Sequence, residues 1–159
     1  RIKKIEFNKV SYLNSIISIN QNIILEAKEK DKKKPSSIYS LYGIPVLLKD
    51  NINFDGLPTT AGSALLKDNV SEDSFVVKKL KESGALVLGK TNLSEWAYYF
   101  CVGCPLGYSA IGGQTLNPYG RKIFESGGSS SGSGVAISAN LSSSILQNTL
   151  KESIKNTFN

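Results

Sequence analysis

Two short apolar runs flank an amphipathic segment, and this alternation is the feature that most restricts the fold. The first run, "GIPVLL" at residues 43–48, and the second, "ALVLG" at residues 85–89, have the length and composition of strands buried on both faces. Residues 71–84 between them predict a helix, with Ser71 as the N-cap and Gly84 as the stop. Strand, helix and strand in this order predict an α/β fold whose two strands are parallel neighbours.

The N-terminal part is strongly basic. Residues 1–34 contain nine basic and four acidic side chains and so carry most of the net charge of +6. This stretch has almost no arginine and no aromatic residues among its lysines, so we expect a solvated face and no nucleic-acid partner. Apolar side chains in residues 11–31 recur close to a 3.6-residue period, which predicts one amphipathic helix that ends before Pro35.

The segment after the second apolar run combines a helix signal with many glycines. Asn92 and Glu95 stand at capping-box spacing and predict a further helix. Residues 101–133 are too rich in glycine for regular elements, and they predict a long loop with a functional role. Cys101 and Cys104 form a C-x-x-C motif in this loop, a pattern of redox pairs and of half a zinc site, but no second ligand pair accompanies them, so we interpret both as ordinary loop residues.

The sequence contains no histidine, and this excludes several kinds of chemistry. Ser-His-Asp and Cys-His catalysis and histidine-ligated metals cannot be built from this chain, so a hydrolytic base must be Lys, Asp, Glu or Tyr. We predict no cofactor and no metal. No apolar run approaches the roughly 18 residues that span a bilayer, which predicts a soluble protein without a membrane partner. The compartment stays unknown, with the cytoplasm favoured, and the absence of Met indicates a natural start upstream.

Two glycine-rich segments suggest phosphate binding or catalysis. Residues 84–91, "GALVLGKT", match the phosphate-loop pattern, but their central residues belong to the second strand, and such a site needs the strand before the loop. Residues 127–141, "GGSSSGSGVAISANL", lead from a loop into an apolar helix. This pattern fits either a tight turn at a helix N-terminus or a catalytic segment. Lys49 favours the second interpretation, because burial at the end of a strand lowers the pKa of a lysine toward that of a usable base.

Four segments in this order, "GIPVLLKDNI", "GKTNLSEWA", "GGQTLNPYG" and "GGSSSGSGVAISANL", resemble the amidase signature family of serine hydrolases. The resemblance runs from about Leu41 to Leu141 and is closer to stand-alone and peptide amidases than to the amidotransferase A-type subunit. It implies the N-terminal part of that α/β fold, a mixed, largely parallel sheet flanked by helices. It also implies a Ser-Ser-Lys triad in which Lys49 is the base and Ser129, held in a cis peptide, is the bridging serine. The implied reaction converts a small carboxylic or peptide amide to an acid plus ammonia or an amine through an acyl-enzyme.

The nucleophile of the family lies 24 residues beyond the bridging serine, and this spacing points to Ser153. Lys151 and Glu152 stand where the family has the small residues of a glycine-rich turn. Apolar residues from Leu146 onward recur at every fourth position, so the tail also fits an amphipathic helix. We divide the partial domain 1–159 into a basic N-terminal region, a signature core and a divergent tail, at residues 1–34, 41–141 and 142–159.

Two main functional hypotheses stay open, and a third that we favour less is an amidotransferase A-type subunit. The first is an amidase. The second is a truncated or decayed, catalytically inactive fragment with the amidase fold, which the substitutions before Ser153 favour. Because the sheet of the family continues beyond the part present in this sequence, we expect apolar surface without its usual cover, low stability and self-association of the chain.

Overall fold

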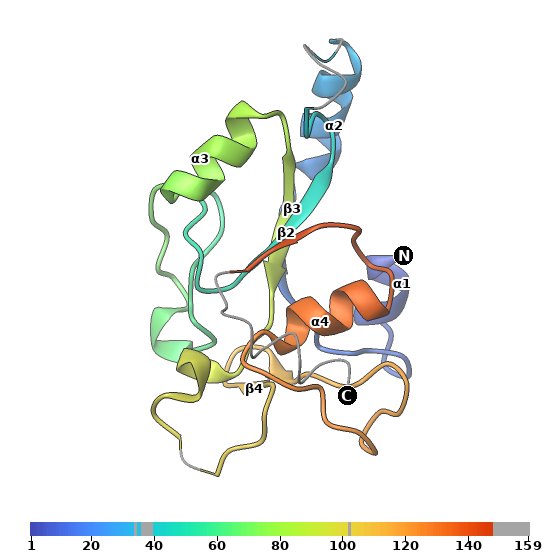
Figure 1. The fold of residues 1–159 in the computed structure, drawn as a ribbon, viewed down its shortest axis with the longest axis vertical. Coiled ribbons are helices and arrows are strands. Elements are labelled where there is room, and N and C mark those ends of the chain that lie inside the picture. The colour runs from blue at the N-terminus through green and yellow to red at the C-terminus, as the bar shows by residue number, and fades with distance from the viewer. Residues whose placement is uncertain (34, 36–39, 102, 148–159) are drawn as a thin grey trace.

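The computed structural model describes residues 1–33, 35, 40–101 and 103–147 (Figure 1). The elements in chain order are α1 (Ile2–Glu6), β1 (Ile16–Ile19), α2 (Ile23–Asp31), β2 (Pro45–Lys49), the 3₁₀ turn η1 (Ala64–Leu66), α3 (Phe75–Glu82), β3 (Leu86–Thr91), the 3₁₀ turn η2 (Glu95–Tyr98), β4 (Tyr108–Ser109), β5 (Gly113–Gln114), α4 (Ser131–Ser138) and β6 (Ile145–Leu146). Four strands form a sheet in the order β1-β3-β2-β6. β2 is parallel to β3 and β6, whereas β1 is antiparallel to β3. The predicted fold class, a mixed and largely parallel sheet flanked by helices, is confirmed.

The two predicted strands form the centre of the sheet and bury both of their faces. Val46 and Leu48 of β2 pack with Val77 of α3, whereas Leu47 packs with Ala136 of α4. Neighbouring side chains on a strand point to opposite faces, so α3 and α4 cover opposite faces of the sheet (Figure 1). The apolar run in β2 is continuous because each face of the strand has a helix of its own.

The predicted central helix, α3, begins later than its sequence suggests. Its N-cap is Ser74 and not Ser71, and the backbone of Ser74 is extended (φ −60°, ψ 158°). The carboxylate of Asp73 accepts a hydrogen bond from the Asp55 N–H at 2.8 Å. This contact ties the segment before Phe75 to another loop, so the segment does not form an additional helical turn.

None of the helices in the described ranges is long and apolar enough to cross a bilayer.

The single helix predicted over residues 11–31 is wrong. This segment forms the edge strand β1, a turn and the shorter helix α2. Asn20 ends the strand, because its Nδ2 donates a hydrogen bond to the Val87 carbonyl of β3 at 3.0 Å. β1 approaches β3 closely because Gly89 has no side chain, and a Cβ at that position would lie 2.3 Å from the Ser18 carbonyl oxygen. Pairing with a distant strand therefore overrides the helical period of the local sequence.

The helix predicted after β3 is also wrong, since only the turn η2 forms there. Asn92 does not cap it. Its Oδ1 accepts a hydrogen bond from the Ser109 hydroxyl at 2.7 Å, and its Nδ2 donates to the Gly113 carbonyl at 3.1 Å. The Glu95 carboxylate accepts from the Ala110 N–H at 2.8 Å. Both side chains thus connect the start of η2 to the segment that contains β4 and β5.

The glycine-rich segment between η2 and α4 is a long connection, as predicted. Its regular structure, in the part that the structure describes, consists of β4 and β5 and the first turn of α4. Cys101 and Cys104 form a disulfide with a Cα–Cα distance of 5.6 Å, so the interpretation of both as ordinary loop residues is wrong. Cys101 and Cys104, three positions apart in one loop, are close enough to form a disulfide. A disulfide needs only these two cysteines, so the lack of further metal ligands does not argue against it.

The predicted tail helix does not begin at Leu146. This residue belongs to β6, where it pairs in parallel with Leu48 of β2. The remaining positions of that predicted helix, residues 148–159, lie outside the described residues. The described part of the tail therefore extends the sheet by one short strand on the side opposite to β1.

Candidate active site

Lys49 and Ser129 form the centre of the candidate site. Lys49 is the last residue of β2, and its Nζ donates a hydrogen bond to the Ser129 Oγ at 3.0 Å, across 80 positions of sequence. The Lys49 residue is 1% exposed. Burial lowers the pKa of Lys49 from 10.5 to about 8, because the charged ammonium loses its hydration. The structure therefore brings together two of the three predicted site residues and buries the lysine in a way that lowers its pKa.

Ser129 is held by its backbone on both sides of its Cα. The peptide bond between Gly128 and Ser129 is cis, as the family resemblance implied. The Ser129 carbonyl accepts a hydrogen bond from the Ser94 N–H at 3.0 Å. Gly128 has no room for a side chain, because a Cβ there would lie 2.6 Å from the Ser94 Oγ. The segment after β3 and the loop before α4 thus pack directly against each other at the site.

The first turn of α4 is attached to the end of β3. The Gly132 N–H donates a hydrogen bond to the Asn92 carbonyl at 3.0 Å. A Cβ on Gly132 would lie only 2.5 Å from that same oxygen, so this close approach requires glycine. The hydroxyls of Thr91 and Ser133 are 2.8 Å apart, and Thr91 is the partner of Lys49 in the register between β2 and β3. The glycines and serines of the segment therefore serve backbone packing, whatever their part in chemistry.

The third predicted residue, Ser153, lies outside the described residues. Its place beside Ser129 stays a prediction. The pair that the structure does describe can move a proton, since a hydroxyl that contacts a lysine can accept a proton on one side and release one on the other. The arrangement suits activation of a further hydroxyl group.

Sequence reasoning missed a second polar cluster directly beside the first. Asp50 follows Lys49, and its Oδ1 lies 3.5 Å from the Lys90 Nζ, with both side chains fully buried. The Lys90 Nζ also donates to the Thr59 Oγ1 at 2.9 Å. Lys90 belongs to the rejected phosphate-loop pattern, and β3 does occupy that pattern as a strand, as predicted. The available signal was a lysine followed by an aspartate at the end of an apolar strand, because such neighbours point to opposite faces.

Comparison with known proteins shows that the chain is similar to amidases. The family model described as Amidase matches residues 2–146. A protein of Arabidopsis thaliana named a probable amidase is 47% identical over 135 residues, which are 81% of this chain and 26% of that protein. An amidase family protein from Bacillus anthracis superposes with a TM-score of 0.84 at 46% identity, over 89% of this chain and 29% of that chain. The peptide amidase from Stenotrophomonas maltophilia gives a TM-score of 0.78 at 46% identity, over 83% and 27% of the two chains. This chain thus spans less than a third of the length of each of these proteins.

Proposed function

Because the chain belongs to the amidase family, we propose that it carries the base and the bridging serine of an enzyme that hydrolyses carboxylic or peptide amides. The observation that supports this most strongly is the 3.0 Å contact between the Lys49 Nζ and the Ser129 Oγ at a buried strand end. The pKa of Lys49, lowered to about 8 by burial, makes its neutral form accessible near neutral pH. A lysine with an ordinary pKa would be protonated there and could not accept a proton.

In the proposed reaction, neutral Lys49 takes the proton of the Ser129 hydroxyl while Ser129 takes a proton from the nucleophilic hydroxyl. That oxygen attacks the amide carbonyl carbon, and the carbonyl π electrons move to the oxygen, which backbone N–H groups stabilise. The tetrahedral intermediate collapses, the C–N bond breaks, and the proton returns through Ser129 to the leaving nitrogen. Water then attacks the acyl-enzyme, which releases the acid and the free serine. No step requires a cofactor.

Ser153 is the nucleophile in this proposal, on the basis of its spacing from Ser129. Lys151 and Glu152 argue against it, since a carboxylate close to the developing oxyanion would oppose the charge that forms there. The second candidate, an inactive product with an amidase fold, draws its support from these two residues. The two candidates differ in whether Ser153 is a reactive serine.

The peptide amidase from Stenotrophomonas maltophilia suggests peptide amides as the first substrates to test. We would measure ammonia release from a panel of simple carboxylic amides and C-terminally amidated peptides. Lys49→Arg should abolish turnover, because arginine stays protonated and cannot act as a base. Lys79→Arg, the same change at an exposed position of α3, is the matched control and should leave turnover unchanged.

A fluorophosphonate probe tests the nucleophile separately. Labelling that Ser153→Ala removes and Lys49→Arg slows would support the full triad. Labelling that survives Ser153→Ala would assign the nucleophile to another serine. If neither turnover nor labelling occurs in the intact chain, the inactive candidate holds, whereas an active Lys49→Arg variant would refute the role of Lys49.

A further inference from the structure

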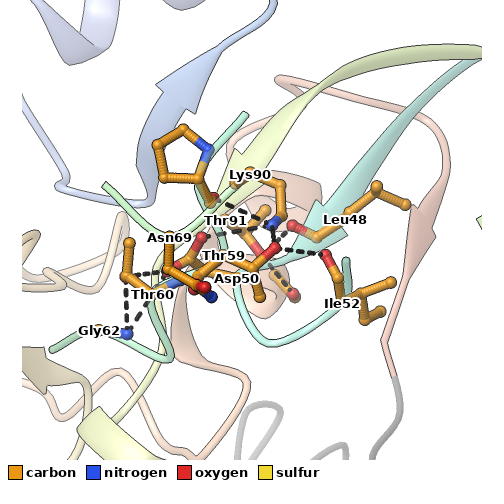
Figure 2. A network of polar contacts seen from close by, with 11 residues as sticks. Leu48, Asp50, Ile52, Thr59, Thr60, Gly62, Asn69, Lys90 and Thr91 are labelled. Carbon is orange, nitrogen blue, oxygen red and sulfur yellow. Dashed lines mark hydrogen bonds and ion pairs between the residues drawn. The ribbon is translucent and has the colours of Figure 1, made fainter. Parts of the chain in front are cut away.

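A buried ion pair lies on the face of the sheet opposite to the candidate base. Lys49 and Thr91 face α4, where they contact Ser129 and Ser133. Asp50 and Lys90 are their sequence neighbours and face the other way, toward the loop that follows β2 (Figure 2). A charged pair with the side chains of both partners fully buried therefore lies one residue away from the proposed base, with Lys90 on β3 and Asp50 directly after β2.

The Asp50 carboxylate is held on two sides. Its Oδ2 accepts hydrogen bonds from the N–H groups of Thr60 and Gly62, at 3.2 and 3.4 Å, and from the Thr60 hydroxyl. Its Oδ1 has no hydrogen-bond partner among the described residues and instead lies 3.5 Å from the Lys90 Nζ. Figure 2 shows the carboxylate between these two sets of contacts. One oxygen is thus satisfied by hydrogen bonds and the other by opposite charge.

Lys90 in turn attaches the same loop to β3. Its Nζ donates to the Pro58 carbonyl at 3.3 Å and to the Thr59 Oγ1 at 2.9 Å. Thr59 is anchored further, because its carbonyl accepts from the Asn69 Nδ2 at 2.9 Å. The Asp50 backbone joins both systems, since its N–H donates to Thr91 and its carbonyl accepts from Ala61. The pair therefore fixes the backbone at the point where β2 ends.

Burying such a pair is costly. Loss of hydration raises the pKa of Asp50 and lowers the pKa of Lys90, while the attraction between their charges opposes both shifts. Apolar side chains of similar volume stabilise a protein interior at least as well as a buried ion pair does. Fold stability alone therefore gives no reason for charges at these two positions, which suggests that they serve the neighbouring site.

We propose that Asp50 and Lys90 are positioning residues for Lys49: the ion pair fixes the end of β2 and cancels the carboxylate charge beside the base. The inference rests on the proposed role of Lys49 as the base. A lone carboxylate at residue 50 would favour the ammonium form of Lys49, which cannot accept a proton. With Lys90 in place, the two opposite charges leave little net field at the Lys49 Nζ. Among the described residues, the Lys49 Nζ contacts the Ser129 hydroxyl, and Thr91 is the register partner of Lys49 on β3.

The test measures the pKa of Lys49 directly, without reference to catalysis. Lysine labelled with ¹³C and ¹⁵N reports the protonation of each Nζ by NMR across a pH titration, and the signal of Lys49 is the one that Lys49→Arg removes. Lys90→Met should raise the pKa of Lys49 by about one, because the Asp50 carboxylate is left without its counter-ion. Asp50→Asn, which keeps an acceptor for Thr60 and Gly62, should lower it.

The double variant Asp50→Asn/Lys90→Met separates charge from structure. It should restore the pKa of Lys49 to within a few tenths of the original value, because both charges are gone. If the ion pair has only a structural role, the pKa of Lys49 in the double variant should differ from the wild-type value at least as much as in the single variants. Lys81→Met, which breaks the ion pair between Lys81 of α3 and Asp73 in the preceding loop, is the matched control and should leave the pKa of Lys49 unchanged.

Two results would overturn the inference: single variants that leave the pKa of Lys49 unchanged, or a double variant that fails to restore it. Circular dichroism identifies any variant that does not fold, and the two single variants give independent tests with opposite signs. Where amide turnover is present, the pH profile of kcat/KM should shift by the same amount as the pKa of Lys49. In Lys90→Met the neutral fraction of Lys49 at pH 7, and with it kcat/KM, should fall about tenfold. Absence of turnover would refute the proposed function and leave the NMR result interpretable.

Discussion

Replacing Lys49 with Met should make the stability of the chain less dependent on pH. Methionine keeps the length and flexibility of the side chain and removes the titrating group. In the wild type, the pKa of Lys49 is about 8 in the folded state and 10.5 when exposed. The unfolded chain therefore binds a proton between these two values that the folded chain does not hold. The free energy of unfolding should therefore rise with pH through this window. The destabilisation caused by burying Lys49 is fully present below pH 8 and disappears as the pH approaches 10.5.

The size of the effect follows from the two pKa values. A difference of one pKa unit corresponds to about 1.4 kcal/mol. Between about pH 7 and about pH 9.5, linkage gives a rise of about 2 kcal/mol as an upper value, and residual solvent screening reduces it to about 1–2 kcal/mol. The lost hydrogen bond to Ser129 also lowers the stability of Lys49→Met, but that contribution does not vary with pH over this range.

The assay is urea denaturation of both proteins at the two pH values, followed by the fluorescence of Trp96, the one tryptophan in the sequence. The difference between the free energies of unfolding of the two proteins removes the contribution of all other titrating groups. The stability of the wild type relative to Lys49→Met should increase by about 1–2 kcal/mol at the higher pH. Lys79→Met, at an exposed lysine, should show no such change. A relative stability that is constant with pH, or that falls, would refute the reasoning that Lys49 is buried with a lowered pKa.

Two further predictions concern stability and association. Gly62→Ala should cost about 2 kcal/mol or more, because residue 62 has a φ of +81° and a Cβ there would lie 2.7 Å from the Ser109 Cβ. Gly43→Ala, with a similar φ of +76° and no neighbour within 4 Å, should cost about 1 kcal/mol, and equal urea midpoints for the two variants would contradict the steric argument. The chain alone should self-associate, because the clustered rings of Trp96, Tyr99 and Phe100 are exposed, Tyr99 to 82% and Phe100 to 73%. Sedimentation that gives a monomer at all concentrations would argue against this.

The part of the fold that the sequence predicts is the part with local signals. β2 and β3 are continuous apolar runs, and the family resemblance alone linked Lys49 to Ser129. β1 could not be predicted in the same way, because its isoleucines fit a helical period and the edge of β3 that binds them is formed 70 residues later. β1 can approach that edge because Gly89 has no side chain, and the sequence around Ser18 contains no signal of this contact.

The ion pair between Asp50 and Lys90 shows a second limit of prediction from the sequence. Asp50 and Lys90 are 40 positions apart, and their contact depends on the register between two strands. A shift of one pairing position would separate them, so composition and motif spacing contain no direct sign of the contact. The helix predicted after β3 failed for a related reason: the Asn92 side chain binds groups in a loop that the local sequence does not specify.

The alternation of β2 has a consequence for how this segment can change in evolution. Lys49 and Asp50 occupy opposite faces because they are neighbours on a strand whose register is fixed by β3. The loss of one residue within β2 would move Asp50 into the position of Lys49, facing Ser129, whereas the gain of one residue would move Lys49 into the position of Asp50, facing Thr60. Substitutions that keep the length of the strand change its packing gradually, whereas a change in its length would remove the lysine from Ser129 in a single step.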